Sequence, residues 1–164
     1  MKLISYPTTA IDINDFANFA DLFEIVDSCK FFSTGKNGDF ELRILIARNK
    51  TDLRTNQYSL GFGVWNPTLR DIDDHFQTRN DDMRVILATV AQRAIEFLKK
   101  KPSALIYAEG SSVARTRLYQ REIAKIICEI PDEFIVKGLI RKDDIGFVIF
   151  KAGLNYDGFL LSSK

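Results

Sequence analysis

The sequence predicts one α+β domain over residues 1–164, with a mainly antiparallel sheet of about five to seven strands packed against two long helices. Short apolar segments occur in pairs that are joined by polar or glycine-containing turns, a pattern typical of β-hairpins. Two longer segments repeat apolar residues every three or four positions, as amphipathic helices do. Because no linker, low-complexity tract or internal repeat separates these segments, we treat the chain as a single domain.

The charge of the chain is nearly balanced. It has 23 Lys and Arg residues against 22 Asp and Glu residues, a formal net charge of +1. Net charge therefore does not draw this protein to nucleic acid, and any contact with phosphates would have to come from a local basic patch.

Cysteine usage and hydropathy favour a cytoplasmic protein. Cys29 and Cys128 show neither metal-ligand nor CxxC spacing, so we expect both to be reduced, buried thiols. No apolar stretch approaches the roughly 20 residues needed to span a bilayer. The N-terminal residues also lack the apolar core of a signal peptide.

The first half of the chain predicts three strands. Residues 30–34 and 40–48 flank a GKNG turn and should form a hairpin, and residues 57–65 form the third strand. Residues 12–28 are expected to be a short helix or an extended lead-in, with residues 1–28 as an N-terminal extension. We expect the early phenylalanines to lie in the core rather than on a partner-binding surface. They are Phe16, Phe19, Phe23, Phe31, Phe32 and Phe40.

Residues 67–79 are expected to be a polar connection. It contains Asp71, Asp73, Asp74 and His75, whose oxygen and imidazole ligands would suit a divalent cation. The spacing is not that of a calcium loop, so a solvated turn is the favoured interpretation and no metal site is predicted. Since His75 is the only histidine, sites that need two histidines are excluded.

The first helix is predicted to begin at a cap formed by Asn80 or Asp81 and to end before Pro102. Asp81 and Asp82 suit the positive end of the helix dipole, and the three lysines at 99–101 suit its negative end. The apolar positions define one wide face that should be buried. They are Met83, Ile86, Leu87, Val90, Ala91, Ala94, Ile95 and Leu98.

The most informative stretch is residues 104–127. An apolar strand at 104–109 ends in Glu109 and a Gly-Ser-Ser turn, and a helix with Ser112 as its N-cap follows directly. Such a corner leaves backbone N–H groups unpaired at the helix start, which suits an anion. Tyr119, Ile123 and Ile126 fall on the face that should be buried, together with Ile130.

The basic residues of this helix occupy other faces. Arg117, Arg121 and Lys125 are spaced four apart and predict a basic stripe opposite the buried face. This stripe is either a solvated helix face or a binding surface for an anion or nucleic-acid backbone. Arg115 lies at the border, where it could bind an anion at the corner or pair with a structural carboxylate such as Glu109. The predicted anion-binding residues are Gly110, Ser111, Ser112, Arg115, Arg117, Arg121 and Lys125, with Glu109 as a candidate functional carboxylate.

The end of the chain predicts a second hairpin and a last strand. Residues 134–140 and 145–151 are expected to pair across a turn at 141–144. A short strand near residues 159–161 is expected to close the sheet.

Five segments in this order resemble an uncharacterised family of bacterial proteins that is frequent in Bacteroidetes and known only as a domain of unknown function. They are GKNG, QYSLGFG, residues 80–91, Pro102 before a strand, and GSSVARTRLYQREI. The last motif of the family reads Gly-Ser-Ser/Thr, two residues, then Arg-Thr-Arg-Leu-Tyr. It matches Gly110, Ser111, Ser112, Arg115, Thr116, Arg117, Leu118 and Tyr119.

The resemblance covers residues 29–160, and the chain departs mildly from the family pattern at Ile86 and Leu87, in a Val-Leu step. It implies a shared fold and an important Gly-Ser-Ser motif, and it transfers no activity and no cofactor.

Three functional hypotheses remain. The first is a non-enzymatic binding module for an anionic ligand, above all nucleic-acid backbone, with Tyr58, Phe62 and Trp65 stacking on bases. The second is a small toxin-like enzyme acting on RNA or nucleotides, with Glu109 as general base. The third is a protein-binding component of a toxin–antitoxin or phage-defence locus. The absence of a GxSxG elbow argues against a serine hydrolase, and the sequence contains no Walker A or dinucleotide-binding glycine motif.

Overall fold

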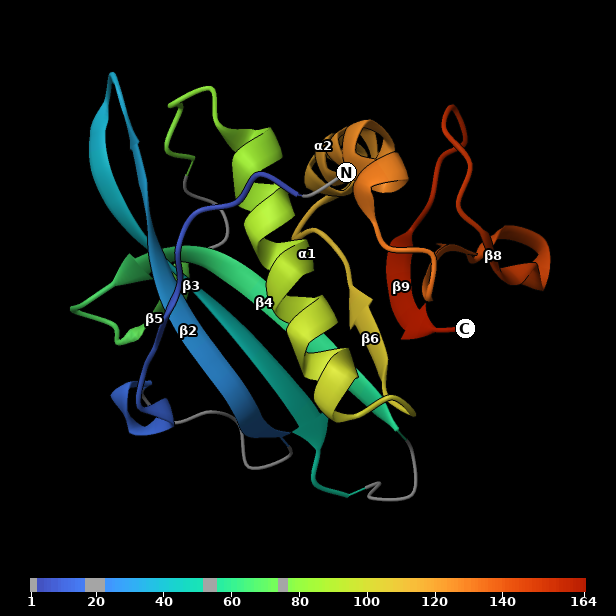
Figure 1. Ribbon diagram of the computed structural model, residues 1–164, viewed down its shortest axis with the longest axis horizontal. Coiled ribbons are helices and arrows are strands. Elements are labelled where there is room, and N and C mark those ends of the chain that lie inside the picture. The colour runs from blue at the N-terminus through green and yellow to red at the C-terminus, as the bar shows by residue number, and fades with distance from the viewer. Residues whose placement is uncertain (1–2, 17–22, 52–55, 74–76) are drawn as a thin grey trace.

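The computed structural model describes residues 3–16, 23–51, 56–73 and 77–164 (Figure 1). These residues form an α+β fold with one large mixed sheet and two α-helices. The strands are β1 (Thr9–Ala10), β2 (Phe23–Gly35), β3 (Gly38–Asn49), β4 (Gln57–Asn66), β5 (Asp71–Asp73), β6 (Leu105–Ala108), β7 (Phe134–Ile140), β8 (Gly146–Ile149) and β9 (Gly158–Ser163). The helices are α1 (Met83–Lys100) and α2 (Val113–Ile126), with 3-10 turns η1 (Ile13–Asp15), η2 (Ile127–Glu129) and η3 (Lys142–Asp144).

Within the described residues the sheet has nine strands, more than the five to seven expected. Its order is β1-β2-β3-β4-β6-β9-β7-β8, with β5 added beside the end of β4. All pairs between described strands are antiparallel except β4–β6, which is parallel over three residue pairs. The sheet is therefore mixed because the chain crosses over through α1 between β4 and β6.

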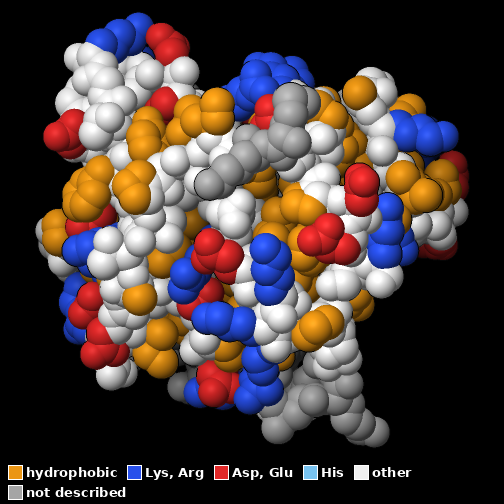
Figure 2. All heavy atoms as spheres, viewed as in Figure 1, with side chains coloured by type: hydrophobic (Ala, Val, Ile, Leu, Met, Phe, Trp, Pro, Cys, Tyr) orange, Lys and Arg blue, Asp and Glu red, His pale blue; other side chains and the backbone are white. Residues whose placement is uncertain are grey.

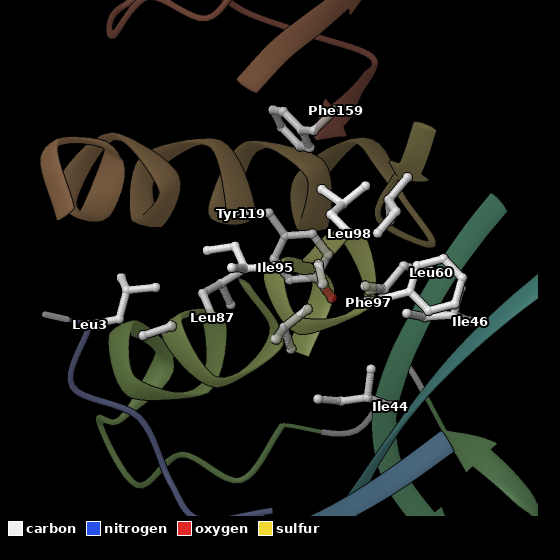
Figure 3. Packing of buried hydrophobic residues seen from close by; sticks show 14 of the residues in the cluster. Leu3, Ile44, Ile46, Leu60, Leu87, Ile95, Phe97, Leu98, Tyr119 and Phe159 are labelled. Atoms are coloured by element: carbon white, nitrogen blue, oxygen red, sulfur yellow. The ribbon is translucent and has the colours of Figure 1, made fainter. Parts of the chain in front are cut away.

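Both helices pack on one face of this sheet and form the main core with it. The predicted buried face of α1 is confirmed: Ile86, Ile95 and Leu98 are each at most 2% exposed. Figure 3 shows Tyr119 of α2 pointing into the same cluster, with Phe159 entering from β9. Arg93 of α1 also forms two hydrogen bonds with the Asp27 carboxylate of β2, at 2.6 and 2.9 Å.

The opposite face of the β2–β4 region is also covered. Phe16, Leu45 and Ala47 form a second, smaller apolar cluster there. Arg43, which alternation along β3 places on this face, is 7% exposed. Its guanidinium lies 3.6 Å from the Trp65 ring centroid and pairs with Glu41 at 2.7 Å. Aromatic rings and carboxylates therefore enclose the Arg43 guanidinium on this face.

Several element boundaries differ from the sequence prediction. The first hairpin is confirmed around its GKNG turn, where Gly38 has φ +105°, but β2 begins at Phe23, within the expected lead-in. The polar connection contains β5, which pairs with β4. The N-cap of α1 is Asp82 rather than Asn80 or Asp81. The Asp82 carboxylate instead accepts hydrogen bonds from Tyr6 and Ser33 and so joins α1 to the sheet.

The last strand occupies a different position from the one expected. β9 lies inside the sheet between β6 and β7, and the edge is formed by β8. The second hairpin itself, β7–β8, is confirmed. This strand order matters for the site, because it brings the end of β7 and the start of β9 beside the end of β6.

Other expectations are confirmed only in part. Phe16 and Phe31 are buried, but Phe32 is 47% exposed, and Phe19 lies outside the described residues. Cys29 is buried as expected, whereas Cys128 is exposed. Across the described ranges, no helix is long and apolar enough to cross a membrane. Figure 2 shows basic and acidic side chains interspersed over α1, in keeping with the balanced net charge.

Candidate functional site

The corner between β6 and α2 is built around Ser112. The Ser112 hydroxyl oxygen accepts a hydrogen bond from the Arg115 N–H at 3.2 Å, as predicted for an N-cap. Its carbonyl oxygen accepts from the N–H and the hydroxyl of Thr116, both at 3.0 Å. These bonds leave the N–H groups of Val113 and Ala114, in the first turn of α2, directed away from the helix.

Gly110 lets the chain pass close to the start of α2. Its N–H donates to the Thr116 hydroxyl at 3.1 Å. A Cβ atom at this position would lie 2.5 Å from the Thr116 backbone nitrogen, which no side chain can tolerate without movement of the backbone. The corner therefore requires glycine because the strand exit and the helix start touch.

A polar pocket of about 340 Å³ opens at this corner. One wall comes from the corner and α2, and the other comes from Arg141 after β7 and from two residues that precede β9. The lining residues are Glu109, Gly110, Ser111, Ser112, Val113, Thr116, Arg117, Arg141, Tyr156 and Asp157. The pocket thus combines the N-terminal turn of a helix with two guanidinium groups and two carboxylates.

Arg141, Glu109 and Tyr107 form one hydrogen-bonded group at the rim. Arg141 donates to the Glu109 carboxylate at 3.2 Å and to the Tyr107 hydroxyl oxygen at 3.3 Å. The hydrogen bond to Glu109 makes the largest contribution to the raised pKa of Arg141. Burial raises the pKa of Tyr107, and the negative charge of Glu109 raises it further. At neutral pH the group therefore holds a charged Arg141 and a neutral Tyr107.

The floor of the pocket is held by α2. Arg117 donates to the Tyr156 carbonyl oxygen at 2.6 Å, and the Gln120 side-chain oxygen accepts from the Tyr156 N–H at 2.9 Å. The Tyr156 side chain is fully buried, and its ring fills the space that a Cβ atom on Gly138 would need. Asp157 is thereby fixed at the mouth of the pocket, where its carboxylate accepts from the Arg141 N–H at 2.8 Å.

The structure brings together some of the predicted site residues and separates others. Glu109 and the Gly-Ser-Ser turn line the pocket with Arg117. Arg115 lies instead on the buried side of α2, where it is 9% exposed and donates to the Tyr119 hydroxyl oxygen at 3.5 Å. Arg121 and Lys125 are exposed further along α2, and Lys125 pairs with Glu122 at 3.0 Å. Glu109 pairs with Arg141 rather than with Arg115.

The aromatic side chains expected to stack on bases are packed into the protein. Tyr58 is 7% exposed and meets Phe97 edge-on, and Phe62 packs against Tyr119 with ring centroids 5.2 Å apart. Trp65 faces the other side of the sheet, beneath Arg43. A stacking platform made of Tyr58, Phe62 and Trp65 is therefore wrong, because these residues lie on two faces of the sheet and are buried or half-buried there.

The acidic connection is described only in part. Asp71 and Asp73 lie in β5, whereas Asp74 and His75 fall outside the described residues. Within the described ranges, no group of three His, Cys, Asp or Glu side chains is placed to hold a metal ion.

Arg141 and Asp157 were not identified from the sequence. Arg141 looks like an ordinary turn residue after a strand, and Asp157 sits in a short connection. Both reach the corner because β9 inserts between β6 and β7. No local pattern in the sequence signals this insertion, since it depends on long-range strand pairing.

The fold and the pocket define an α+β protein with a polar pocket at a strand-to-helix corner of a mixed sheet. The chain belongs to DUF6934, a family of unknown function, which matches residues 22–164. The match includes the corner and both walls of the pocket, and it extends beyond the 29–160 range of the resemblance noted in the sequence. No curated protein and no solved structure matches the chain.

Proposed function

We propose that the corner pocket binds an anionic group, phosphate or carboxylate, and that the protein is a binding module rather than an enzyme. The observation that carries this proposal is the convergence of the first turn of α2 with the guanidinium groups of Arg117 and Arg141 on one pocket. Helix N-termini attract anions through exposed N–H groups and the helix dipole. Guanidinium groups add directed, charge-assisted hydrogen bonds.

Both arginines keep donors for a ligand. A guanidinium group carries five N–H donors. Arg117 gives a donor to the Tyr156 carbonyl oxygen, and Arg141 gives donors to Glu109 and Tyr107. The remaining N–H groups on the pocket side are the ones that would bind an anion.

The two carboxylates of the pocket reduce its net positive charge. The charge of Glu109 is offset by Arg141, and Asp157 accepts a backbone hydrogen bond. The site is therefore close to neutral overall. This favours one small anionic group held by directed hydrogen bonds over a long polyanion held by charge alone.

A nucleic-acid backbone is one source of such a group, and phosphorylated small molecules are another. Arg121 and Lys125 lie further along the same helix and would extend a backbone contact. The packed positions of Tyr58 and Phe62 favour the small-molecule source, because they take away the expected base-stacking surface.

The test is calorimetric titration of the protein with inorganic phosphate at low ionic strength. Arg141→Ala should weaken phosphate binding at least tenfold, because a hydrogen bond to a charged group contributes about 1.5–3 kcal/mol. Arg121→Ala, on the same helix but outside the pocket, should bind as the parent does. Equal affinities of the parent and Arg141→Ala, or no binding by the parent, would remove the support for this pocket.

Single-stranded and duplex DNA and RNA form the second arm of the test. If three or four backbone phosphates are bound, the logarithm of the affinity should fall with the logarithm of salt concentration with a slope of roughly −2 to −4. Arg121→Ala should then reduce that slope by about one contact. Phosphate binding without nucleic-acid binding would assign the pocket to a small ligand.

A further inference from the structure

The parallel pair β4–β6 separates before either strand ends. Pairing runs only from Gln57 and Leu105 to Ser59 and Tyr107. Beyond this point β4 continues to Asn66 beside β3 and β5, whereas β6 stops and turns toward α2. The sheet therefore opens into a wedge at the carboxyl end of β6, and α2 lies over it.

This wedge contains an apolar cavity of about 140 Å³. Leu60 and Phe62 line it from β4, beyond the last paired residue, and Ile106 lines it from β6. Val90 of α1 and Ile123 of α2 contribute from the helix layer. The space is apolar on the sheet side and on the helix side alike.

The apolar cavity and the polar corner pocket lie next to each other. Glu109 and Ser111 line both spaces, so the two are separated by no more than the chain that leaves β6. The Glu109 carboxylate is held toward Arg141 at 3.2 Å, on the polar side. Polar donors therefore lie on one side of this chain segment and apolar side chains on the other.

We propose that the ligand of this protein is a small amphiphile, in which an anionic head joins an apolar group of about six carbons. The head occupies the corner pocket, and the apolar group enters the wedge between β4, β6 and α2. This inference rests on the proposed anion-binding function and adds the chemical class of the ligand.

The size of the apolar group follows from the volume of the cavity. An apolar protein cavity of about 150 Å³, lined by aliphatic and aromatic side chains, stays dry and binds benzene. A cavity of about 140 Å³ with a comparable lining thus suits a phenyl ring or a short alkyl chain. Protein interiors contain few voids of this size, because the side chains around an empty space lose their dispersion contacts. A ligand tail would restore them.

The experiment is a titration series on the whole protein with inorganic phosphate and with ethyl, butyl, hexyl, phenyl and decyl phosphate. Each methylene up to about six carbons should tighten binding about threefold to fourfold, as burial of CH₂ groups predicts. Longer chains should add little, because the cavity is then full. A parallel series from acetate to hexanoate distinguishes a phosphate head from a carboxylate head.

Two cavity variants and one control variant locate the apolar group of the ligand. Ala91→Leu fills the cavity from α1 and should reduce the affinity for hexyl phosphate to that for ethyl phosphate, with phosphate binding unchanged. Ala124→Leu, a matched helix substitution outside the cavity lining, should leave the whole series unchanged. Ile123→Ala enlarges the cavity and should move the optimum to longer chains, which keeps the test decisive if Ala91→Leu fails to fold.

The outcomes separate the two proposals. If phosphate binds and chain length adds nothing, the amphiphile is wrong and the anion site stands. If hexanol binds as tightly as hexyl phosphate and phosphate does not bind, both the anion site and the amphiphile are wrong. An affinity that rises with chain length and is lost in Ala91→Leu supports the amphiphile.

Discussion

The guanidinium group of Arg117 donates a hydrogen bond to the carbonyl oxygen of Tyr156, at 2.6 Å. This bond joins the second turn of α2 to the segment that leads into β9, which is far away in the sequence. Gln120 makes a second link to the same residue. Arg117 therefore lines the corner pocket and also holds Tyr156, which lines the opposite wall, in place.

Arg117→Ala should lower the free energy of unfolding by about 1.5–3 kcal/mol, because the Tyr156 carbonyl oxygen loses a charged donor in a partly buried place. Chemical denaturation measures this directly. Arg121→Ala is the control on the exposed part of the same helix, and it should change stability by about 0.5 kcal/mol or less. Equal stabilities of the two variants would show that the Arg117 bond contributes little.

Gly110→Ala should destabilise the protein by about 1–3 kcal/mol and weaken phosphate binding. The added methyl group would lie 2.5 Å from the Thr116 nitrogen, so the helix start has to move away from the corner. Gly61→Ala is the matched control, because its methyl group would meet its nearest neighbour at 3.6 Å, an ordinary contact. Thermal unfolding and phosphate titration of both variants give the comparison. A Gly110→Ala protein that behaves like the parent would mean that the corner relaxes without loss.

Local patterns predicted the elements that local chemistry determines. The GKNG hairpin, the buried face of α1 and the Ser112 cap depend on residues within a few positions of one another. The residues that complete the corner pocket come from distant parts of the sequence. Arg141 reaches Glu109 only because β9 inserts between β6 and β7, a pairing that no short motif encodes.

The sequence also could not predict which way the arginine side chains point. Helical periodicity placed Arg115 at a border, and it could not decide whether that border faces the pocket or the core. The structure turns Arg115 toward Tyr119 and leaves Arg117 at the pocket. Arg43 on β3 is a similar case, since it is buried by Trp65, a residue from another strand.

Stability should fall in alkali through Cys29. Burial raises the pKa of this thiol from 9.0 to about 11. As the pH rises above about 9, the unfolded chain loses the proton first, so the stabilisation is complete below pH 9 and is lost progressively toward pH 11. The expected loss between pH 8 and pH 10.5 is about 2 kcal/mol in the free energy of unfolding.

Urea denaturation at the two pH values measures this loss, and Cys29→Ala is the control that removes the titrating group. The variant should show a smaller loss, with a remainder from Tyr107, whose pKa is also raised. An identical loss in the parent and the variant would assign the alkaline effect to other groups. A thiol reagent at neutral pH should modify exposed Cys128 and spare Cys29 until the protein unfolds.

Glu109→Gln distinguishes a binding module from an enzyme. If the pocket only binds anions, loss of this carboxylate removes a negative charge from the site and releases the Arg141 donor. Phosphate should then bind roughly fivefold more tightly at low salt, the equivalent of about 1 kcal/mol for one charge at close range in water. Stability should change little, because Glu109 and Arg141 are 45% and 58% exposed in their side chains.

Glu109→Asp is the control that keeps the charge, and it should bind phosphate as the parent does. The gain in Glu109→Gln should shrink at high salt, since screening weakens the repulsion that the substitution removes. The parent and both variants should also be incubated with RNA, DNA and nucleoside triphosphates, with and without magnesium. Cleavage by the parent that disappears in Glu109→Gln, with fold and phosphate binding intact, would make Glu109 a general base and the protein an enzyme.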